Sequence, residues 1–195
     1  LYQLNGISMY SSTNTEVMWD FVKNMGFENL ENRFQYAGST EVTDMLLGIR
    51  YLFCRNTRKL HTVYKKIGES QSFDLYENSR ALKAGYMVSD SVLDYAMEGT
   101  DPLEVQNRLL SGIAGKRLYK MQTVSSEAVW AGTVDFDISL KEGEHGYLYI
   151  PGTEPETVTI NGQEQKSDYW NNNFLDLGTY DTDTVVHVTA ETGMQ

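Results

Sequence analysis

The residues best suited to acid–base or metal chemistry are spread thinly along this sequence. None of its three histidines, His61, His145 and His187, has a second histidine two or four positions away, the spacing that gathers metal ligands on a strand or helix. Asp135-Phe136-Asp137 has the Asp-x-Asp spacing that holds a divalent ion in many nucleotide-sugar transferases. It lies in an alternating run, however, which places both carboxylates on a solvent-facing strand surface.

Motifs for covalent or nucleotide chemistry are also missing. The sequence has no Gly-x-Ser-x-Gly elbow, no phosphate-binding P-loop and no dinucleotide glycine pattern. Its one cysteine, Cys54, excludes an intramolecular disulfide and any cysteine-clustered metal site. We therefore predict no catalytic residues, no metal site and no cofactor in this chain.

Aromatic residues offer a different chemistry, the binding of sugars. Phe, Trp and Tyr make up 12% of the chain. Pyranose C–H faces stack on exposed rings while nearby Asp and Asn side chains bind the hydroxyls, and the tract 168–173 (DYWNNN) has this composition. The alternative is that these rings form core and anchor loops. The glycan-binding candidates are Trp130, Tyr147, Tyr149, Tyr169 and Trp170.

A basic segment is the candidate for binding phosphate. Residues 55–59 are predicted to form a basic loop, and two lysines follow a few positions later. Clustered Lys and Arg side chains bind phosphate oxygens, although such a cluster also occurs as a solvated charged loop. The candidates are Arg55, Arg58, Lys59, Lys65 and Lys66.

Charge divides the chain into two parts. The formal net charge is −11, but residues 1–120 hold 14 basic and 14 acidic residues, whereas residues 121–195 hold 2 and 13. This balance argues against a nucleic-acid partner, which needs a basic surface. The acidic part would also repel a polyphosphate unless cations bridge the two. We predict two structural units, residues 1–117 and 118–195.

Helix signals are confined to the first unit. The capping-box spacing of Thr13 and Glu16, followed by apolar residues at helical spacing, predicts a helix over 14–25 that ends at Gly26. Two further helices are predicted over Thr40–Leu47, before Gly48, and from Asp101-Pro102 to Gly112 and Gly115. Strands are predicted at Ile49–Cys54, Phe73–Tyr76 and Tyr86–Ser89.

The second unit reads as short strands. Val134–Leu140 alternates between apolar and polar residues, as a half-buried strand does. Asn161-Gly162 predicts a two-residue hairpin between 157–160 and 163–166. Other strands are predicted at Tyr147–Ile150, Phe174–Leu177 and Val185–Thr189, the last with His187 on its solvent face. The predicted fold class is α+β: a small mixed α/β unit followed by an antiparallel β-sandwich, similar to a jelly roll.

Four segments, taken in order, resemble the YfhO family of bacterial membrane proteins. They read "LNGISMYSSTN", "DMLLGIRYLF", "YKKIG" with "FDLYENSRALKAGYMV", and "DPLEVQNRLLSGIAG", and together they cover roughly residues 1–115. The sequence departs from the family pattern at two positions. The family commonly has Pro where this chain has Ala84, and it usually has a basic residue after the Asn-Gly turn, where this chain has Gln163. The matching positions are Tyr10 to Ser12, Asp44 to Tyr51, Tyr76 to Asn78, Leu82, Gly85, Tyr86, Gln106 and Asn107.

The resemblance implies a polytopic parent protein of the bacterial cell membrane. Such proteins are similar to GT-C-type glycosyltransferases, which use polyprenyl-phosphate-linked sugars, and members are implicated in glycosylating lipoteichoic or wall teichoic acid. Catalytic carboxylates are then expected in loops between transmembrane helices, outside this sequence. We expect this chain to be a soluble extracytoplasmic region that is itself non-catalytic. Its expected partners are the transmembrane part of the same chain and a cell-wall glycopolymer.

Two other functional classes remain open. A stand-alone carbohydrate-binding module would bind a short neutral glycan tightly and lose it on Trp170→Ala. A soluble hydrolase built across both units would turn over simple esters or glycosides, although no motif in the sequence supports that chemistry.

Overall fold

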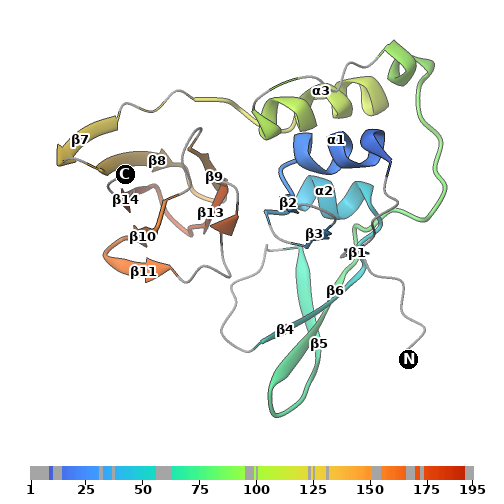
Figure 1. Cartoon of the computed structure of the whole chain (residues 1–195). Coiled ribbons are helices and arrows are strands. Elements are labelled where there is room, and N and C mark those ends of the chain that lie inside the picture. Colours follow the sequence, from blue (N-terminus) through green and yellow to red (C-terminus); the bar gives the residue numbers. More distant parts are fainter. Residues whose placement is uncertain are drawn as a thin grey trace. The chain divides into compact units, whose positions relative to one another are not determined.

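The chain divides into two compact units that are interleaved along the sequence (Figure 1). The computed structural model describes residues 9–10, 15–30, 33–36, 38–55, 63–94, 99, 101–122, 124, 126–130, 132–150, 155–165, 170–171 and 174–191. Unit 1 consists of Leu1–Gly38, Met97–Val105 and Tyr119–Gln195, and unit 2 of Ser39–Ala96 and Gln106–Leu118. That residues 1–117 and 118–195 fold as separate domains stays a prediction.

Two antiparallel sheets dominate unit 1. The larger has the strand order β11-β10-β14-β8-β7, and the smaller has the order β12-β13-β9. The strands are β7 (Ser126–Trp130), β8 (Thr133–Leu140), β9 (His145–Tyr149), β10 (Thr157–Ile160), β11 (Gln163–Gln165), β12 (Trp170–Asn171), β13 (Phe174–Thr179) and β14 (Thr184–Glu191). The sequence predicted all of these except β7 and β12.

The two sheets share one apolar core. Alternation along β8 buries Ile138 and leaves Asp137 exposed, as the sequence predicts. The core residues come from both sheets: Ile138, Leu148, Val158, Leu175, Leu177, Val186, Val188 and Ala190. Together with the helices described below, this arrangement confirms the predicted α+β class with a β-sandwich.

The predicted hairpin turn joins β10 to β11. Asn161 and Gly162 have φ values of 52° and 74°, the positive values that a two-residue type I′ turn requires. The turn is also tied to β14, because the Asn161 N–H donates to the His187 carbonyl at 2.8 Å. The His187 N–H in turn donates to Asn161 Oδ1 at 2.9 Å.

Unit 1 also contains a helix whose start differs from the prediction. Helix α1 spans Glu16–Asn24 and is capped by Thr15, whose extended backbone lets its hydroxyl accept the Met18 N–H at 3.4 Å. The predicted cap, Thr13, lies outside the described residues. The helix ends as predicted, with Gly26 at a φ of 93°.

A small sheet of short strands completes unit 1. Its order is β1-β3-β2, with β1 at Met9–Tyr10, β2 at Glu28–Leu30 and β3 at Arg33–Gln35. The sequence did not predict this sheet, because two or three residues are too few for an alternating pattern to be visible.

Unit 2 combines helices with one three-stranded sheet. The sheet has the order β4-β6-β5, from Tyr51–Arg55, Phe73–Asn78 and Tyr64–Glu69. Helix α2 (Glu41–Leu46) begins after Thr40, as predicted, and Thr40 and Thr43 form a reciprocal capping box. Helix α3 (Pro102–Ala114) belongs to unit 2 from Gln106 onward, and a 3₁₀ helix, η1, spans Asp90–Asp94.

The predicted start of α3 is confirmed. Asp101 Oδ1 accepts the N–H groups of Leu103 at 2.9 Å and Glu104 at 3.3 Å, which satisfies two donors of the first helical turn. The helix runs through Gly112 and ends before Gly115, which has a φ of 65°. Gly115 is therefore the terminating glycine of the two that the sequence suggested.

In unit 2, one predicted strand is absent, one strand was not predicted, and one predicted loop began too early. Residues 86–89 form no strand: Tyr86, Met87 and Val88 are exposed, so no apolar burial fixes this segment in a sheet. Strand β5 was missed, since Lys65-Lys66 interrupts the apolar pattern. Arg55, predicted to begin a loop, is instead the last residue of β4 and pairs with Phe73.

Candidate functional site

Strand β9 presents a row of polar aromatic residues on one face. Burial alternates along it, so that Gly146 and Leu148 are buried whereas His145, Tyr147 and Tyr149 are half-buried. The inner face is closely packed: a Cβ atom at Gly146 would lie 2.7 Å from Leu140 Cδ1 and 3.2 Å from Leu177 Cβ. This packing fixes which face of β9 points outward.

His145 is held by side chains of the neighbouring strand, β13. Its Nε2 lies 2.7 Å from Asp176 Oδ1, and its Nδ1 lies 2.9 Å from Thr179 Oγ1. A β-bulge between Asp176 and Gly178 places both partners within reach of one imidazole. Because both ring nitrogens are engaged, the imidazole is oriented but is poorly placed to act as a free base or metal ligand.

The tyrosines of β9 extend this surface. The Tyr147 ring lies 4.7 Å from the His145 ring and meets the Tyr119 ring edge-on at 6.0 Å. Burial raises the pKa of Tyr149, and the nearby Asp101 carboxylate raises it further. The Tyr149 hydroxyl therefore stays protonated near neutral pH and can donate a hydrogen bond. Rings beside fixed polar groups are what recognition of a sugar needs.

We use the name β9–β13 surface for the outward-facing side chains of these two strands, which are His145, Tyr147, Tyr149, Asp176 and Thr179. Of the glycan-binding candidates, the structure brings together only Tyr147 and Tyr149 among those whose side chains it describes. Trp130 ends β7, opposite Thr133, and Trp170 lies in β12, opposite Leu175, but their side chains lie outside the described part of the structure. Tyr169 lies outside the described residues.

Sequence reasoning missed three residues of the β9–β13 surface. His145 stands two positions before Tyr147, so extending the predicted strand by two residues would have included it on the same face. Asp176 and Thr179 reach it only through strand pairing and a bulge. No local pattern in the sequence specifies that register.

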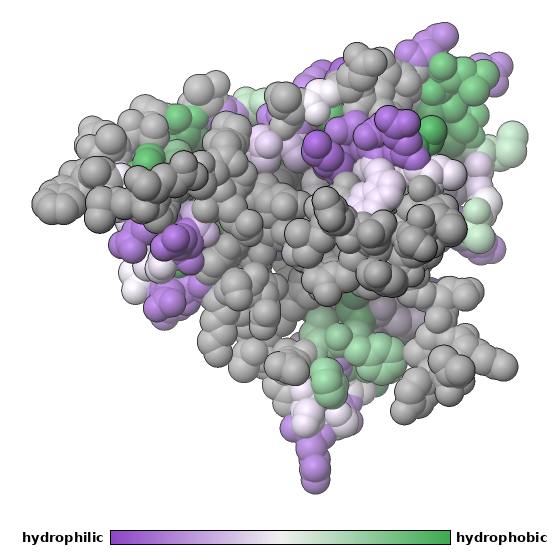
Figure 2. All heavy atoms as spheres, viewed as in Figure 1, coloured by the Kyte–Doolittle hydropathy of each residue, from purple (hydrophilic) through white to green (hydrophobic). Residues whose placement is uncertain are grey.

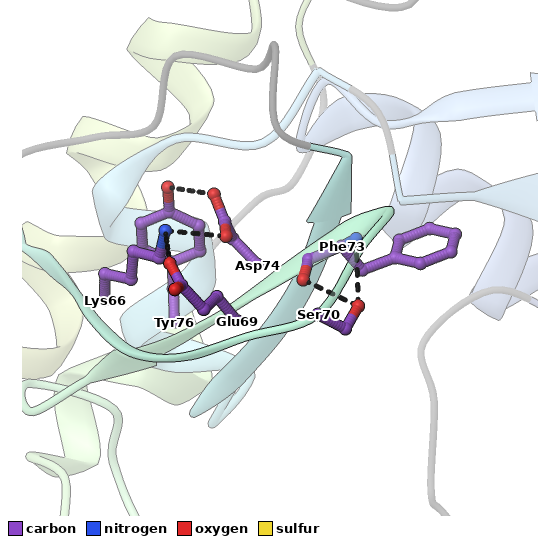
Figure 3. Close-up of polar contacts among 6 residues, drawn as sticks. All are labelled: Lys66, Glu69, Ser70, Phe73, Asp74 and Tyr76. Atoms are coloured by element: carbon purple, nitrogen blue, oxygen red, sulfur yellow. Dashed lines mark hydrogen bonds and ion pairs between the residues drawn. The ribbon is translucent and has the colours of Figure 1, made fainter.

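A second polar group lies on the β5–β6 hairpin, where Lys66 meets two carboxylates (Figure 3). Lys66 Nζ lies 2.7 Å from Asp74 Oδ1 and 2.9 Å from Glu69 Oε2. The Tyr76 hydroxyl reaches Asp74 Oδ2 at 3.4 Å. Hydrogen bonds to both carboxylates raise the pKa of Lys66.

The remaining phosphate-binding candidates are placed differently. Lys65 is exposed and points to the face opposite that of Lys66, because neighbouring strand residues alternate. Arg55 ends β4 without a described side chain, and Arg58 and Lys59 lie outside the described residues. Because Lys66 forms ion pairs with Asp74 and Glu69, Lys65 is the described lysine that is better placed to bind a phosphate.

The Lys66 ion pairs predict a stability effect. We expect Lys66→Met to lower the free energy of unfolding more than Lys65→Met does, because it leaves the nearly buried Asp74 carboxylate without its cation. The folded-state pKa of Lys66 is raised above its ordinary value of 10.5. Its contribution should therefore be complete below that pH and decline as the pH rises through the folded-state value. In urea unfolding, the difference in stability between Lys66→Met and Lys65→Met should be the same at pH 7 and at pH 9. Equal effects of the two variants would contradict a stabilising role of the Lys66 ion pairs.

Of the two carboxylates in the Asp-x-Asp pattern of β8, Asp137 contacts a residue of the neighbouring strand, whereas Asp135 is half-buried. Asp137 and His187 lie directly opposite in the β8–β14 ladder, and Asp137 Oδ1 contacts His187 Nδ1 on the exposed face. His187 is exposed, as the sequence predicts. Among the described residues, no group of three His, Cys, Asp or Glu side chains is arranged to hold a metal ion.

Polar residues of the quoted sequence segments form the interior of unit 2. Asp44, Gln106 and Asn107 are fully buried. The Tyr64 hydroxyl donates to Asp44 Oδ2 at 2.7 Å, and the Thr40 hydroxyl donates to Gln106 Oε1 at 2.8 Å. Asn107 Oδ1 accepts the Leu118 N–H at 3.0 Å. These side chains are buried among their own partners, which indicates a structural role rather than contact with a substrate.

Comparison with known proteins relates the chain to a family. A family model described as "Bacterial membrane protein YfhO" matches residues 1–194. No curated protein matches the chain. No solved structure matches it either. Within the part of the chain that the structure describes, no helix has the length and apolar character to cross a bilayer.

Proposed function

Because this chain belongs to the YfhO family of bacterial membrane proteins, we propose that it is the extracytoplasmic region of a membrane-embedded glycosyltransferase. In this proposal the transmembrane part of the same protein transfers a sugar from a polyprenyl-phosphate donor to lipoteichoic or wall teichoic acid. The extracytoplasmic region is non-catalytic and positions the acceptor. The structural roles of Asp44, Gln106 and Asn107 support this division of labour.

The β9–β13 surface is the proposed glycan-binding site. The observation that carries the proposal is the outward row of His145, Tyr147 and Tyr149 beside Asp176. The Tyr147 ring offers an apolar surface for a pyranose face. The Tyr149 hydroxyl and the Asp176–His145 pair supply a donor and fixed polar atoms for sugar hydroxyls.

Charge restricts the ligand of this surface. Unit 1 holds 5 basic and 20 acidic residues, so it repels the phosphates of a teichoic acid. We therefore assign the β9–β13 surface to neutral sugar units of the glycan. Phosphate groups are assigned to the basic segment of unit 2, to Arg55, Arg58, Lys59 and Lys65.

The test is an NMR titration of the chain with the methyl glycosides of glucose, galactose and N-acetylglucosamine and with a glycerol-phosphate oligomer. We expect at least one neutral glycoside to shift the amide signals of β9 and β13. Tyr147→Ala should then raise the dissociation constant about tenfold or more, which corresponds to about 1.4 kcal/mol. Tyr86→Ala, at an exposed tyrosine of unit 2, is the matched control and should leave it unchanged.

Three outcomes contradict the proposal in different ways. Signal shifts spread over unit 2 alone place sugar recognition elsewhere, and no shift with any glycoside removes the glycan-binding role. Tight binding of a short neutral glycan that is lost on Trp170→Ala supports the stand-alone carbohydrate-binding module instead.

A further inference from the structure

One face of the unit 2 sheet is apolar although it is exposed. The inner face carries buried residues such as Leu52, Cys54 and Asp74. The outer face of an antiparallel sheet is normally polar. Here the outer face exposes large apolar side chains: Tyr51 (51%), Phe53 (63%), Ile67 (47%) and Phe73 (45%). Figure 2 shows apolar residues in the region of this sheet, with hydrophilic residues below them in the view.

Strand register gathers these residues into one patch, which we call the outer sheet face. Phe53 of β4 lies opposite Leu75 of β6, and Gly68 of β5 lies on the other side of Leu75. The bulge between Lys66 and Gly68 adds the exposed Ile67 beside this row. The neighbouring row on one side contains Tyr51, Glu77 and Lys65, and the pair on the other side is Arg55 and Phe73.

Cations border the apolar residues of the outer sheet face. Lys65 is exposed on it, and Arg50 lies at its edge with its guanidinium 5.7 Å from the centre of the Tyr51 ring. The Arg50 guanidinium also pairs with Glu77 at 3.0 Å. Aromatic rings combined with Lys and Arg are characteristic of protein surfaces that lie at the boundary between lipid headgroups and acyl chains.

The charge of the whole unit favours an anionic partner. Unit 2 holds 11 basic and 7 acidic residues, a net charge of +4, whereas unit 1 holds 5 and 20, a net charge of −15. A negatively charged surface therefore attracts unit 2 and repels unit 1. The chain belongs to a family of bacterial membrane proteins, so a lipid surface is within its reach.

We propose that the outer sheet face, with Phe53, Ile67 and Phe73 at its centre, docks on the surface of an anionic lipid bilayer. The aromatic and aliphatic side chains enter the headgroup boundary, and Lys65 and Arg50 contact lipid phosphates. This inference does not depend on the glycan-binding proposal, which concerns unit 1.

The test is flotation of the chain with large unilamellar vesicles of phosphatidylglycerol or of phosphatidylcholine. We expect binding to phosphatidylglycerol vesicles, weakening as sodium chloride is raised, and little binding to phosphatidylcholine. Phe53→Asp combined with Phe73→Asp should lower the partition coefficient about tenfold or more. Leu93→Asp, at an 84% exposed residue of unit 2 outside the sheet, carries the same type of charge change and should have a much smaller effect.

Two further measurements separate apolar docking from purely electrostatic attraction. The uncharged pair Phe53→Ser and Phe73→Ser should weaken binding as well, because the apolar contact is lost while the charge of the chain stays the same. The emission of Phe53→Trp should shift to the blue on adding phosphatidylglycerol vesicles, in excess of any shift of the unsubstituted chain. Circular dichroism confirms that each variant is folded.

Several results would overturn the proposal. Vesicle binding that persists in both double variants places the contact elsewhere. No binding to either lipid removes the membrane role. A dimer in solution that dissociates in the double variants, without vesicle binding, shows instead that the outer sheet face joins two copies of this chain.

Discussion

Replacing Gly48 with alanine is expected to lower the free energy of unfolding by about 3 kcal/mol. Gly48 follows helix α2 with a φ of 65°, a left-handed conformation that costs alanine about 1 kcal/mol. The new Cβ would also lie 2.9 Å from the Leu82 carbonyl oxygen. That contact is with backbone and not with a flexible side-chain end, so one of the two segments must shift.

The close approach at Gly48 has a structural cause. The Met45 carbonyl accepts both the Gly48 N–H at 3.2 Å and the Leu82 N–H at 3.0 Å. The segment after β6 is thereby fixed on the end of α2, and only a residue without a side chain fits between them. Gly48 and Leu82 both lie in the segments that resemble the family, so their pairing explains two motif positions through packing.

Gly85 provides the matched control for Gly48. It lies in the same unit, has no neighbour within 4 Å of a built Cβ, and is not among the positive-φ glycines. Gly85→Ala should therefore change the free energy of unfolding by roughly 0.5 kcal/mol or less. Urea unfolding monitored by circular dichroism measures both variants. Similar effects at the two positions would show that Leu82 does not lie against Gly48.

Sequence-based predictions were accurate where a structural feature depends on residues that are close together in the chain. The Asn161-Gly162 hairpin, the helix start near Thr40 and the Asp101-Pro102 helix start were all predictable because each depends on residues within three positions of one another. Strand β5 depends instead on its pairing with β6, and the absence of a strand at 86–89 depends on burial that this segment does not gain. No local pattern in the sequence reports either of these tertiary contacts.

The candidate site shows the same limit. Tyr147 and Tyr149 were predictable as neighbours because strand residues two positions apart share a face. Asp176 and Thr179 join them across 27 to 32 residues of chain through the β9–β13 register and its bulge. The outer sheet face likewise could not be predicted from the sequence, since Phe53, Ile67 and Phe73 come from three different strands.

Removing one hydroxyl group from the interior of unit 2 is expected to lower the free energy of unfolding nearly as much as the backbone clash at Gly48. Tyr64→Phe should lower the free energy of unfolding by about 2 kcal/mol. The Tyr64 hydroxyl donates to Asp44 Oδ2 at 2.7 Å, and Asp44 is fully buried, so water cannot readily replace the lost donor. Urea unfolding measures the change. Tyr180→Phe is the control, because the Tyr180 hydroxyl makes no hydrogen bond that the structure shows within the described residues, and it should have little effect.

The Asp44–Tyr64 pair also distinguishes a structural carboxylate from a catalytic one. If Asp44 serves only to bind partners inside unit 2, Asp44→Asn and Tyr64→Phe act on the same hydrogen bond and their effects on stability should not add. In the membrane-embedded glycosyltransferase that we propose, activity per folded molecule should then be unchanged by Tyr64→Phe, and only the folded fraction should fall. A catalytic Asp44 would give the opposite result: activity per folded molecule would be lost in Asp44→Asn while the protein remained stable.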